Sequence, residues 1–167
     1  MASDSWSFCF EENLFMKNTF VGNCLMYLAG YYGILQTIHL FFLGRAGIIL
    51  LKTGKVPFPA SPPPGGWSKE VLPYLMGMAA ADVIAILLGI YFVYFLLIKK
   101  TIKPLVGIIS LTIALSSGVV YLIGTLPSGA WSHNPVSYLI VFLAFSPVIP
   151  LFILLAYRTN ANIEGLH

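Results

Sequence analysis

The segment 71–98 is the part of this chain that most restricts its possible folds. It reads VLPYLMGMAAADVIAILLGIYFVYFLLI, and its one formally charged residue is Asp82, near the middle. At a rise of ~1.5 Å per residue, a helix of this length crosses the ~30 Å hydrocarbon core of a bilayer. A lone carboxylate at that depth costs about 2.5 kcal/mol or more, and such groups usually face a bundle interior or a cavity. The sequence therefore predicts a membrane helix that turns a functional acid toward its neighbours.

The composition extends this prediction to the whole chain. Hydrophobic residues make up 58% and charged residues 9%, with a mean hydropathy of +0.87, whereas soluble domains carry roughly 25% charged residues. We expect an all-α integral membrane protein, a four-helix bundle with spans of about 20–51, 72–98, 104–126 and 136–157. One domain, 19–157, then lies between an N-terminal polar segment, 1–18, and a polar tail, 158–167.

The connections between the spans carry charges and turn-forming residues. TGKVPFPASPPPGGW is a proline-rich loop, the lysines of 99–103 mark a tight turn between antiparallel helices, and PSGAWSHNP is a further loop. Pro147 and Pro150 are expected to kink the last span, because proline removes a backbone hydrogen bond. Four spans place both termini and the lysine turn on one side, which the positive-inside rule assigns to the cytoplasm.

The sequence disfavours several function classes. A net charge of +3 without a basic stripe argues against nucleic acid as a partner. Cys9 and Cys24 lack the spacing of metal ligands, the His residues are far apart, and there is no phosphate-binding glycine loop, so we expect no cofactor and no metal. The acidic residues within 1–18 and the long first apolar run do not fit a cleavable signal peptide. The expected surroundings are the lipid bilayer itself.

The first span supplies a candidate partner for Asp82. Its stretch YYGILQTIHLFFLGR holds Gln36, Thr37 and His39, and ionisable groups on neighbouring membrane helices lower each other's cost by pairing. We therefore expect His39 to meet Asp82. Two interpretations stay open: the pair specifies helix packing alone, or it lines a cavity and acts on a ligand.

Hydroxyl and aromatic side chains are candidates for the wall of such a cavity. The hydroxyl residues on the last two spans include Ser110, Thr112, Ser116, Ser117 and Ser146. Small hydroxyl residues in membrane helices more often mediate close packing than bind ligands. Tyrosines such as Tyr121 belong either to an interfacial belt or to a pocket for a flat hydrophobic molecule.

Four short patterns occur here in an order and spacing that is found in a known family. They are Thr37-Ile38-His39-Leu40 with Gly44, Ala81-Asp82-Val83-Ile84-Ala85 with Gly89, Val119-Val120-Tyr121 before Asn134-Pro135, and FSPVIPL at 145–151. On these patterns the chain resembles the EXPERA family of membrane proteins, which includes the emopamil-binding sterol isomerases and the sigma-2 receptor.

The resemblance implies a bundle that binds a sterol, in which a His and an acid move protons while a double bond migrates. It maps these catalytic roles onto His39 and Asp82. Further acids of the isomerases fall at Leu43 and Gly118 here, and Ser146 takes the place of an asparagine. The ligand-binding residues that we predict are Gln36, His39, Asp82, Tyr121 and Ser146. The family also implies the endoplasmic reticulum and a homodimer.

Three functions therefore stay open at the level of sequence. The first is binding of a sterol or another hydrophobic or cationic amphiphile, with or without sterol double-bond isomerase activity. The second is a small structural or assembly subunit of a larger membrane complex, in which a partner helix satisfies Asp82. The third, a proton or solute conduit, needs polar groups from one face to the other, whereas the sequence between Asp82 and either loop is mostly apolar.

Overall fold

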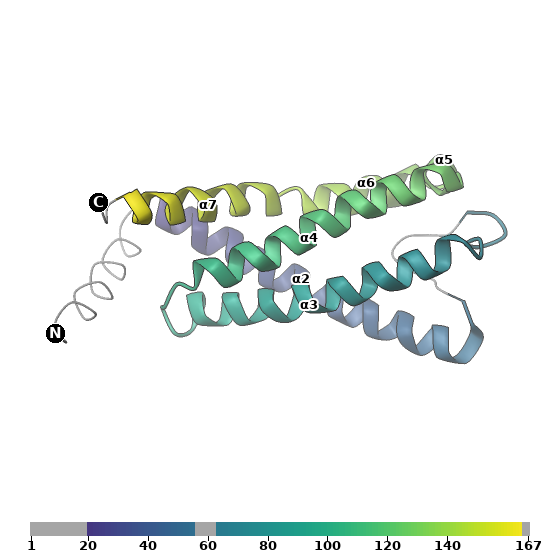
Figure 1. The fold of residues 1–167 in the computed structure, drawn as a ribbon, viewed down its shortest axis with the longest axis horizontal. Coiled ribbons are helices and arrows are strands. Elements are labelled where there is room, and N and C mark those ends of the chain that lie inside the picture. The colour runs from purple at the N-terminus through teal and green to yellow at the C-terminus, as the bar shows by residue number, and fades with distance from the viewer. Residues whose placement is uncertain (1–19, 56–62, 165–167) are drawn as a thin grey trace.

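The computed structural model describes residues 20–55 and 63–164, and these ranges are helical apart from short connections (Figure 1). No strand occurs within them. The predicted N-terminal polar segment, 1–18, lies outside the described residues, as does part of the proline-rich loop. In chain order the elements are α2 (Phe20–Thr53), α3 (Val71–Leu97), α4 (Pro104–Thr125), the 3₁₀ turn η1 (Leu126–Ser128), α5 (Ala130–His133), α6 (Pro135–Phe145) and α7 (Val148–Glu164).

Four helical stretches are long and apolar enough to cross a membrane. They are Phe20–Thr53, Val71–Leu97, Pro104–Ser128 and Pro135–Thr159. The chain is therefore an all-α integral membrane protein with the predicted four-helix architecture. The first three predicted spans differ from α2, α3 and α4 by at most two residues at either end. The agreement is close because lysines and prolines, which are costly or disruptive inside a membrane helix, stand at these ends.

The fourth span consists of two helices rather than one. Helix α6 ends at Phe145 and α7 begins at Val148, so the break falls on Ser146 and Pro147. Pro147 has no backbone N–H and its ring obstructs the preceding turn, which is the physical reason for the predicted kink. Pro150 lies in the first turn of α7, where a proline is tolerated.

Two other segments are more regular than we expect from the sequence. The loop predicted at 127–135 contains most of η1 and all of α5. Helix α7 continues to Glu164, so the first part of the predicted polar tail extends the helix beyond the apolar span. Polar residues there do not end the helix because, outside the hydrocarbon, a helical backbone needs no apolar side chains.

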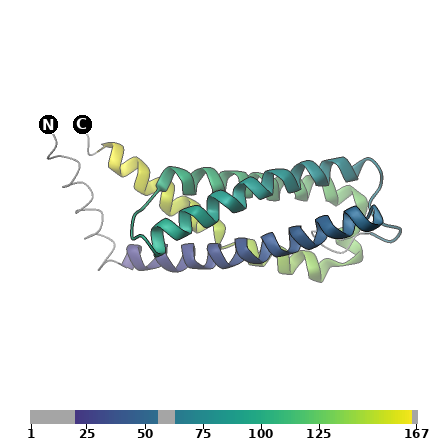
Figure 2. The ribbon, with the colours of Figure 1, turned by 90° about the horizontal axis from the view of Figure 1, so that it is seen from below.

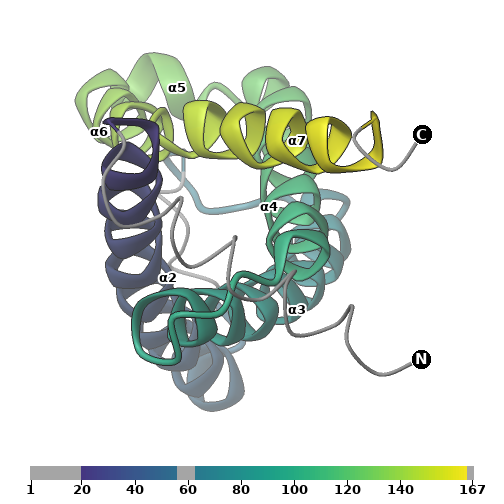
Figure 3. The same cartoon turned by 90° about the vertical axis from the view of Figure 1, so that its left-hand side faces the viewer.

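Helices α2, α3, α4 and α7 form the frame of the bundle. Each packs against the next, and α7 returns to α2, which Figure 3 shows along the bundle. Helices α2 and α3 both extend along the long direction of the molecule (Figure 2), and α2 crosses α3 obliquely near their middles (Figure 1). The start of α2, the α3–α4 turn and the end of α7 lie at the same end of the molecule (Figure 1). This arrangement is the one that four antiparallel crossings require.

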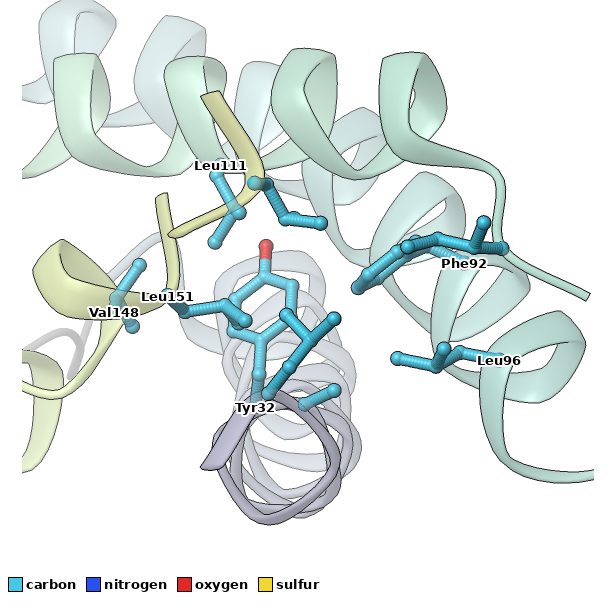
Figure 4. Packing of buried hydrophobic residues seen from close by; sticks show 10 residues of the cluster. Tyr32, Phe92, Leu96, Leu111, Val148 and Leu151 are labelled. Carbon is cyan, nitrogen blue, oxygen red and sulfur yellow. The ribbon is translucent and has the colours of Figure 1, made fainter. Parts of the chain in front are cut away.

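The main core lies in the half of the bundle nearer the termini. It is built on Tyr32 of α2, whose ring points between the other helices (Figure 4). The buried residues of this cluster are Leu25, Ala29, Tyr32, Phe92, Leu96, Ile102, Leu111, Val148, Leu151 and Leu155. In α2 the buried positions Leu25, Ala29, Tyr32 and Gln36 recur every three or four residues, the spacing of one helical face. That face continues directly to His39.

Candidate functional site

The structure places the two ionisable groups predicted to pair next to each other. His39 Nε2 lies 3.9 Å from Asp82 Oδ2, and each side chain keeps 13% of its surface exposed. This distance is within ion-pair range but longer than an N–H···O hydrogen bond of ~2.7–3.2 Å. The two side chains are therefore neighbours without a mutual hydrogen bond, and they are not fully sealed in the bundle.

Helices α4 and α6 contribute the nearest further groups. The Ser117 hydroxyl of α4 lies close enough to the Asp82 carboxylate to interact with it. The ring of Phe145, the last residue of α6, meets the His39 imidazole edge to face, with centroids 5.8 Å apart and an interplanar angle of 83°. His39, Asp82, Ser117 and Phe145 thus bring four helices to one place. A carboxylate, an imidazole and a hydroxyl beside an aromatic wall suit a head group that is small and polar or cationic.

A second polar layer lies one helical turn away, around Gln36. Gln36 Nε2 donates to the Tyr32 hydroxyl at 2.5 Å, and that hydroxyl lies 2.8 Å from Ser110 Oγ. Ser110 Oγ in turn donates to the Ala85 carbonyl oxygen at 2.7 Å. Figure 4 shows the Tyr32 hydroxyl at the tip of a ring surrounded by apolar residues of the core. This chain of hydrogen bonds links α2, α4 and α3 inside the apolar interior.

The contacts of the other two predicted ligand-binding residues are with residues other than His39 and Asp82. Tyr121 is one turn of α4 beyond Ser117 and stacks on Tyr138, with ring centroids 6.1 Å apart. Trp131 of α5 also stacks on Tyr138, with ring centroids 4.4 Å apart. Ser146 lies at the α6–α7 break, where its hydroxyl donates to the Leu143 carbonyl oxygen at 2.8 Å. A ligand role for Tyr121 and Ser146 stays a prediction.

Tyr32, Ser110 and Ser117 are more central to the site in the structure than their sequence patterns indicate. Ser110 and Ser117 are buried on α4, at a spacing of seven residues that places them on one helical face. Gly118, where the resemblance expects an acid, is exposed instead. The seven-residue spacing was the available signal, but hydroxyl residues on membrane helices commonly serve packing alone.

An open groove lies between α2 and α3, on the side of Thr37 rather than of His39. Its volume is about 430 Å³, and it is lined by Gly30, Gly33, Ile34, Thr37, Ile38, Ile90, Val93, Tyr94 and Leu97. The lining is nearly all apolar, and the Thr37 hydroxyl donates to the Gly33 carbonyl oxygen of its own helix. The groove therefore offers a surface for lipid chains and contains neither His39 nor Asp82.

Within residues 20–55 and 63–164, no group of three or more His, Cys, Asp or Glu side chains is placed to hold a metal ion. The chemistry that the described residues offer is proton exchange, hydrogen bonding and ion pairing at His39 and Asp82.

Comparisons of the chain with protein-family models, with curated proteins and with solved structures find no match.

Proposed function

We propose that this protein binds a sterol or another hydrophobic or cationic amphiphile inside the membrane, at His39 and Asp82. The observation that carries the proposal is the contact itself. A carboxylate and an imidazole lie 3.9 Å apart and incompletely buried, in the middle of an apolar bundle where ionisable groups are costly and usually functional. A ligand with one polar or positively charged end would engage this pair while its apolar body lies among the helices. The EXPERA-like patterns around both residues agree with such a ligand.

The proposal predicts that an Asp82→Asn variant loses its response to cationic amphiphiles. Because the amide keeps the size of the carboxylate but not its charge, the fold should persist. We would titrate detergent-purified protein with sterols and cationic amphiphiles in a thermal-shift assay. A ligand at 100 times its dissociation constant stabilises the folded wild type by ~2.7 kcal/mol if only that state binds.

Glu70→Gln is the matched control for this experiment. Glu70 carries the same charge, is exposed, and immediately precedes α3. Its substitution should leave the thermal shift unchanged. An equal shift in wild type and Asp82→Asn would remove Asp82 from the binding site.

A catalytic extension of this proposal is sterol double-bond isomerisation. One member of the pair delivers a proton to an alkene carbon, and the other removes a proton from a neighbouring carbon, so the double bond moves without net oxidation. His39 and Asp82 are the acid and base available for this step. His39→Ala and Asp82→Asn should each abolish double-bond migration in a reconstituted assay with sterol product analysis. Migration that survives either substitution would refute the assigned role.

The alternative function, an assembly subunit, draws on the exposure of the second half of α2. There Phe41, Ile48 and Leu51 are 68%, 57% and 88% exposed, as they would be on a helix that contacts a partner. In this alternative a helix of another protein interacts with the Asp82 carboxylate. In the structure, His39 and Ser117 of the same chain already neighbour that carboxylate. The binding proposal is favoured for that reason. Under the alternative, Asp82→Leu would change the proteins that co-purify, and amphiphiles would give no thermal shift.

We further propose that the termini face the cytoplasm and that the protein resides in the endoplasmic reticulum as a homodimer. The end of the bundle with the α3–α4 turn carries Lys99, Lys100, Lys103 and Arg158, and the opposite end carries Lys52, Lys55 and Lys69. The excess of basic residues at the first end supports the orientation. The organelle and the dimer are supported by the family resemblance alone.

A further inference from the structure

The hydrogen-bond chain that starts at Gln36 has a defined direction. Ser110 Oγ has one hydrogen, and it is donated to the Ala85 carbonyl oxygen. Ser110 must therefore accept in its contact with Tyr32, so the Tyr32 hydroxyl donates its own single hydrogen to Ser110. The Tyr32 oxygen is then an acceptor toward Gln36, which agrees with the bond from Gln36 Nε2 at 2.5 Å.

This direction determines which end of the Gln36 amide is left over. Because Tyr32 has no hydrogen to spare, the amide must present its NH₂ group to Tyr32 and turn Oε1 away from it. Gln36 is 1% exposed, and its Oε1 accepts no hydrogen bond from any residue that the structure describes. A buried acceptor without a donor costs about 1–3 kcal/mol. Gln36 Oε1 would therefore be stabilised by a hydrogen-bond donor from a bound molecule.

The position of this acceptor relates it to the proposed ligand site. Gln36 and His39 are three residues apart on the buried face of α2, where side chains at this spacing are neighbours. Ala85, at the far end of the hydrogen-bond chain, is likewise three residues from Asp82 on α3. Gln36 and the His39–Asp82 pair are thus about one helical turn apart in the interior of the bundle.

We propose that Gln36 selects ligands whose polar end donates a hydrogen bond, and that the Tyr32–Ser110–Ala85 chain holds its amide in the accepting orientation. The inference rests on the proposed amphiphile binding and narrows its ligand class. Ammonium or hydroxyl head groups fit, because they can donate to Gln36 Oε1 while they engage Asp82. A quaternary ammonium head carries the same charge but has no N–H, so it leaves Oε1 without a donor.

Two amphiphiles with the same chain test this selection: dodecylamine, which is protonated at neutral pH, and dodecyltrimethylammonium. Their dissociation constants are measured on the full chain in detergent, for wild type and Gln36→Met. Methionine keeps the length of glutamine but has no comparable acceptor. We expect the preference for dodecylamine to fall about tenfold in the variant, since one hydrogen bond to a charged group contributes at least that factor. The preference is the ratio of the two dissociation constants in one protein. Differences between the amphiphiles that do not involve Gln36 affect wild type and variant equally, so they cancel when the two preferences are compared.

Ser110→Ala is a second variant that leaves Gln36 in place. Without Ser110 the Tyr32 hydroxyl can donate to Gln36 Oε1, and the amide can turn its NH₂ group toward the ligand. The preference for dodecylamine should therefore fall here as well, whereas loosened packing alone would weaken both amphiphiles equally. This variant decides the question if Gln36→Met does not fold.

The outcomes separate this inference from the function on which it rests. An unchanged preference in both variants, with both amphiphiles bound by wild type, overturns the role of Gln36 and leaves amphiphile binding intact. Failure of the folded wild type to bind either amphiphile overturns the proposed function itself, and the selection by Gln36 with it.

Discussion

At the scale of single residues, Gly89 is what allows three helices to meet at the Gln36 layer. A Cβ atom at Gly89 would lie 2.9 Å from both Ser110 Oγ and the Tyr32 ring. Gly89→Ala must therefore displace two members of the hydrogen-bond chain. We expect the free energy of unfolding in detergent to fall by about 1–3 kcal/mol, the usual cost of overpacking a core.

Gly77→Ala is the control for this prediction, because Gly77 lies on the same helix and a Cβ there meets nothing within 4 Å. Alanine should be neutral or slightly stabilising at that position, since it is the better helix former. Equal effects at Gly77 and Gly89 would mean that helix propensity, and not the contact with Tyr32 and Ser110, governs both sites.

At the scale of elements, the break between α6 and α7 is stabilised by donors that replace the missing amide. Pro147 cannot donate to the Leu143 carbonyl oxygen, and the Ser146 hydroxyl does so instead at 2.8 Å. The Tyr31 hydroxyl of α2 donates to the neighbouring Ala144 carbonyl oxygen at 2.6 Å. Lipid offers no hydrogen bonds, so carbonyl groups released by a proline need such partners. Tyr31 thereby also ties the break to α2, close to Phe145 and His39.

This account predicts that the cost of Ser146→Ala depends on Pro147. In the wild-type background the substitution leaves the Leu143 carbonyl without a donor and should cost about 1–2 kcal/mol of unfolding free energy. In a Pro147→Ala background the restored N–H can bond to that carbonyl, so the same substitution should cost less than half as much. A double-mutant cycle in detergent measures the coupling. Strict additivity would show that Ser146 does not compensate for the proline.

At the scale of the whole molecule, the four spans predict which loops share a side of the membrane. The end of α2, the start of α3 and α5 lie at one end, and the α3–α4 turn lies at the other (Figure 1). We would replace Cys9 and Cys24 by Ser and introduce single cysteines by Lys55→Cys, Ser132→Cys and Lys99→Cys, all at exposed positions. A membrane-impermeant maleimide should label the first two from one side of sealed vesicles and the third only from the other. Labelling of Lys55→Cys and Ser132→Cys from opposite sides would contradict four spans.

The sequence by itself determined the number of spans, the ends of the first three and the place of the break in the last one. Long apolar runs, terminal lysines and Pro147 act locally, so their effect does not depend on the rest of the fold. The cost of two ionisable groups in the hydrocarbon was also enough to predict that His39 and Asp82 are neighbours, as they are at 3.9 Å.

Only the tertiary structure decided which face of each helix is buried. In a soluble helix a polar face marks the outside, but membrane helices are apolar all round, so the pattern that would orient Ser117 inward and Gly118 outward is nearly absent. The direction of the chain from Gln36 through Tyr32 to Ser110 likewise depends on three helices meeting at Gly89. Such contacts join residues far apart in sequence, and no local pattern encodes them.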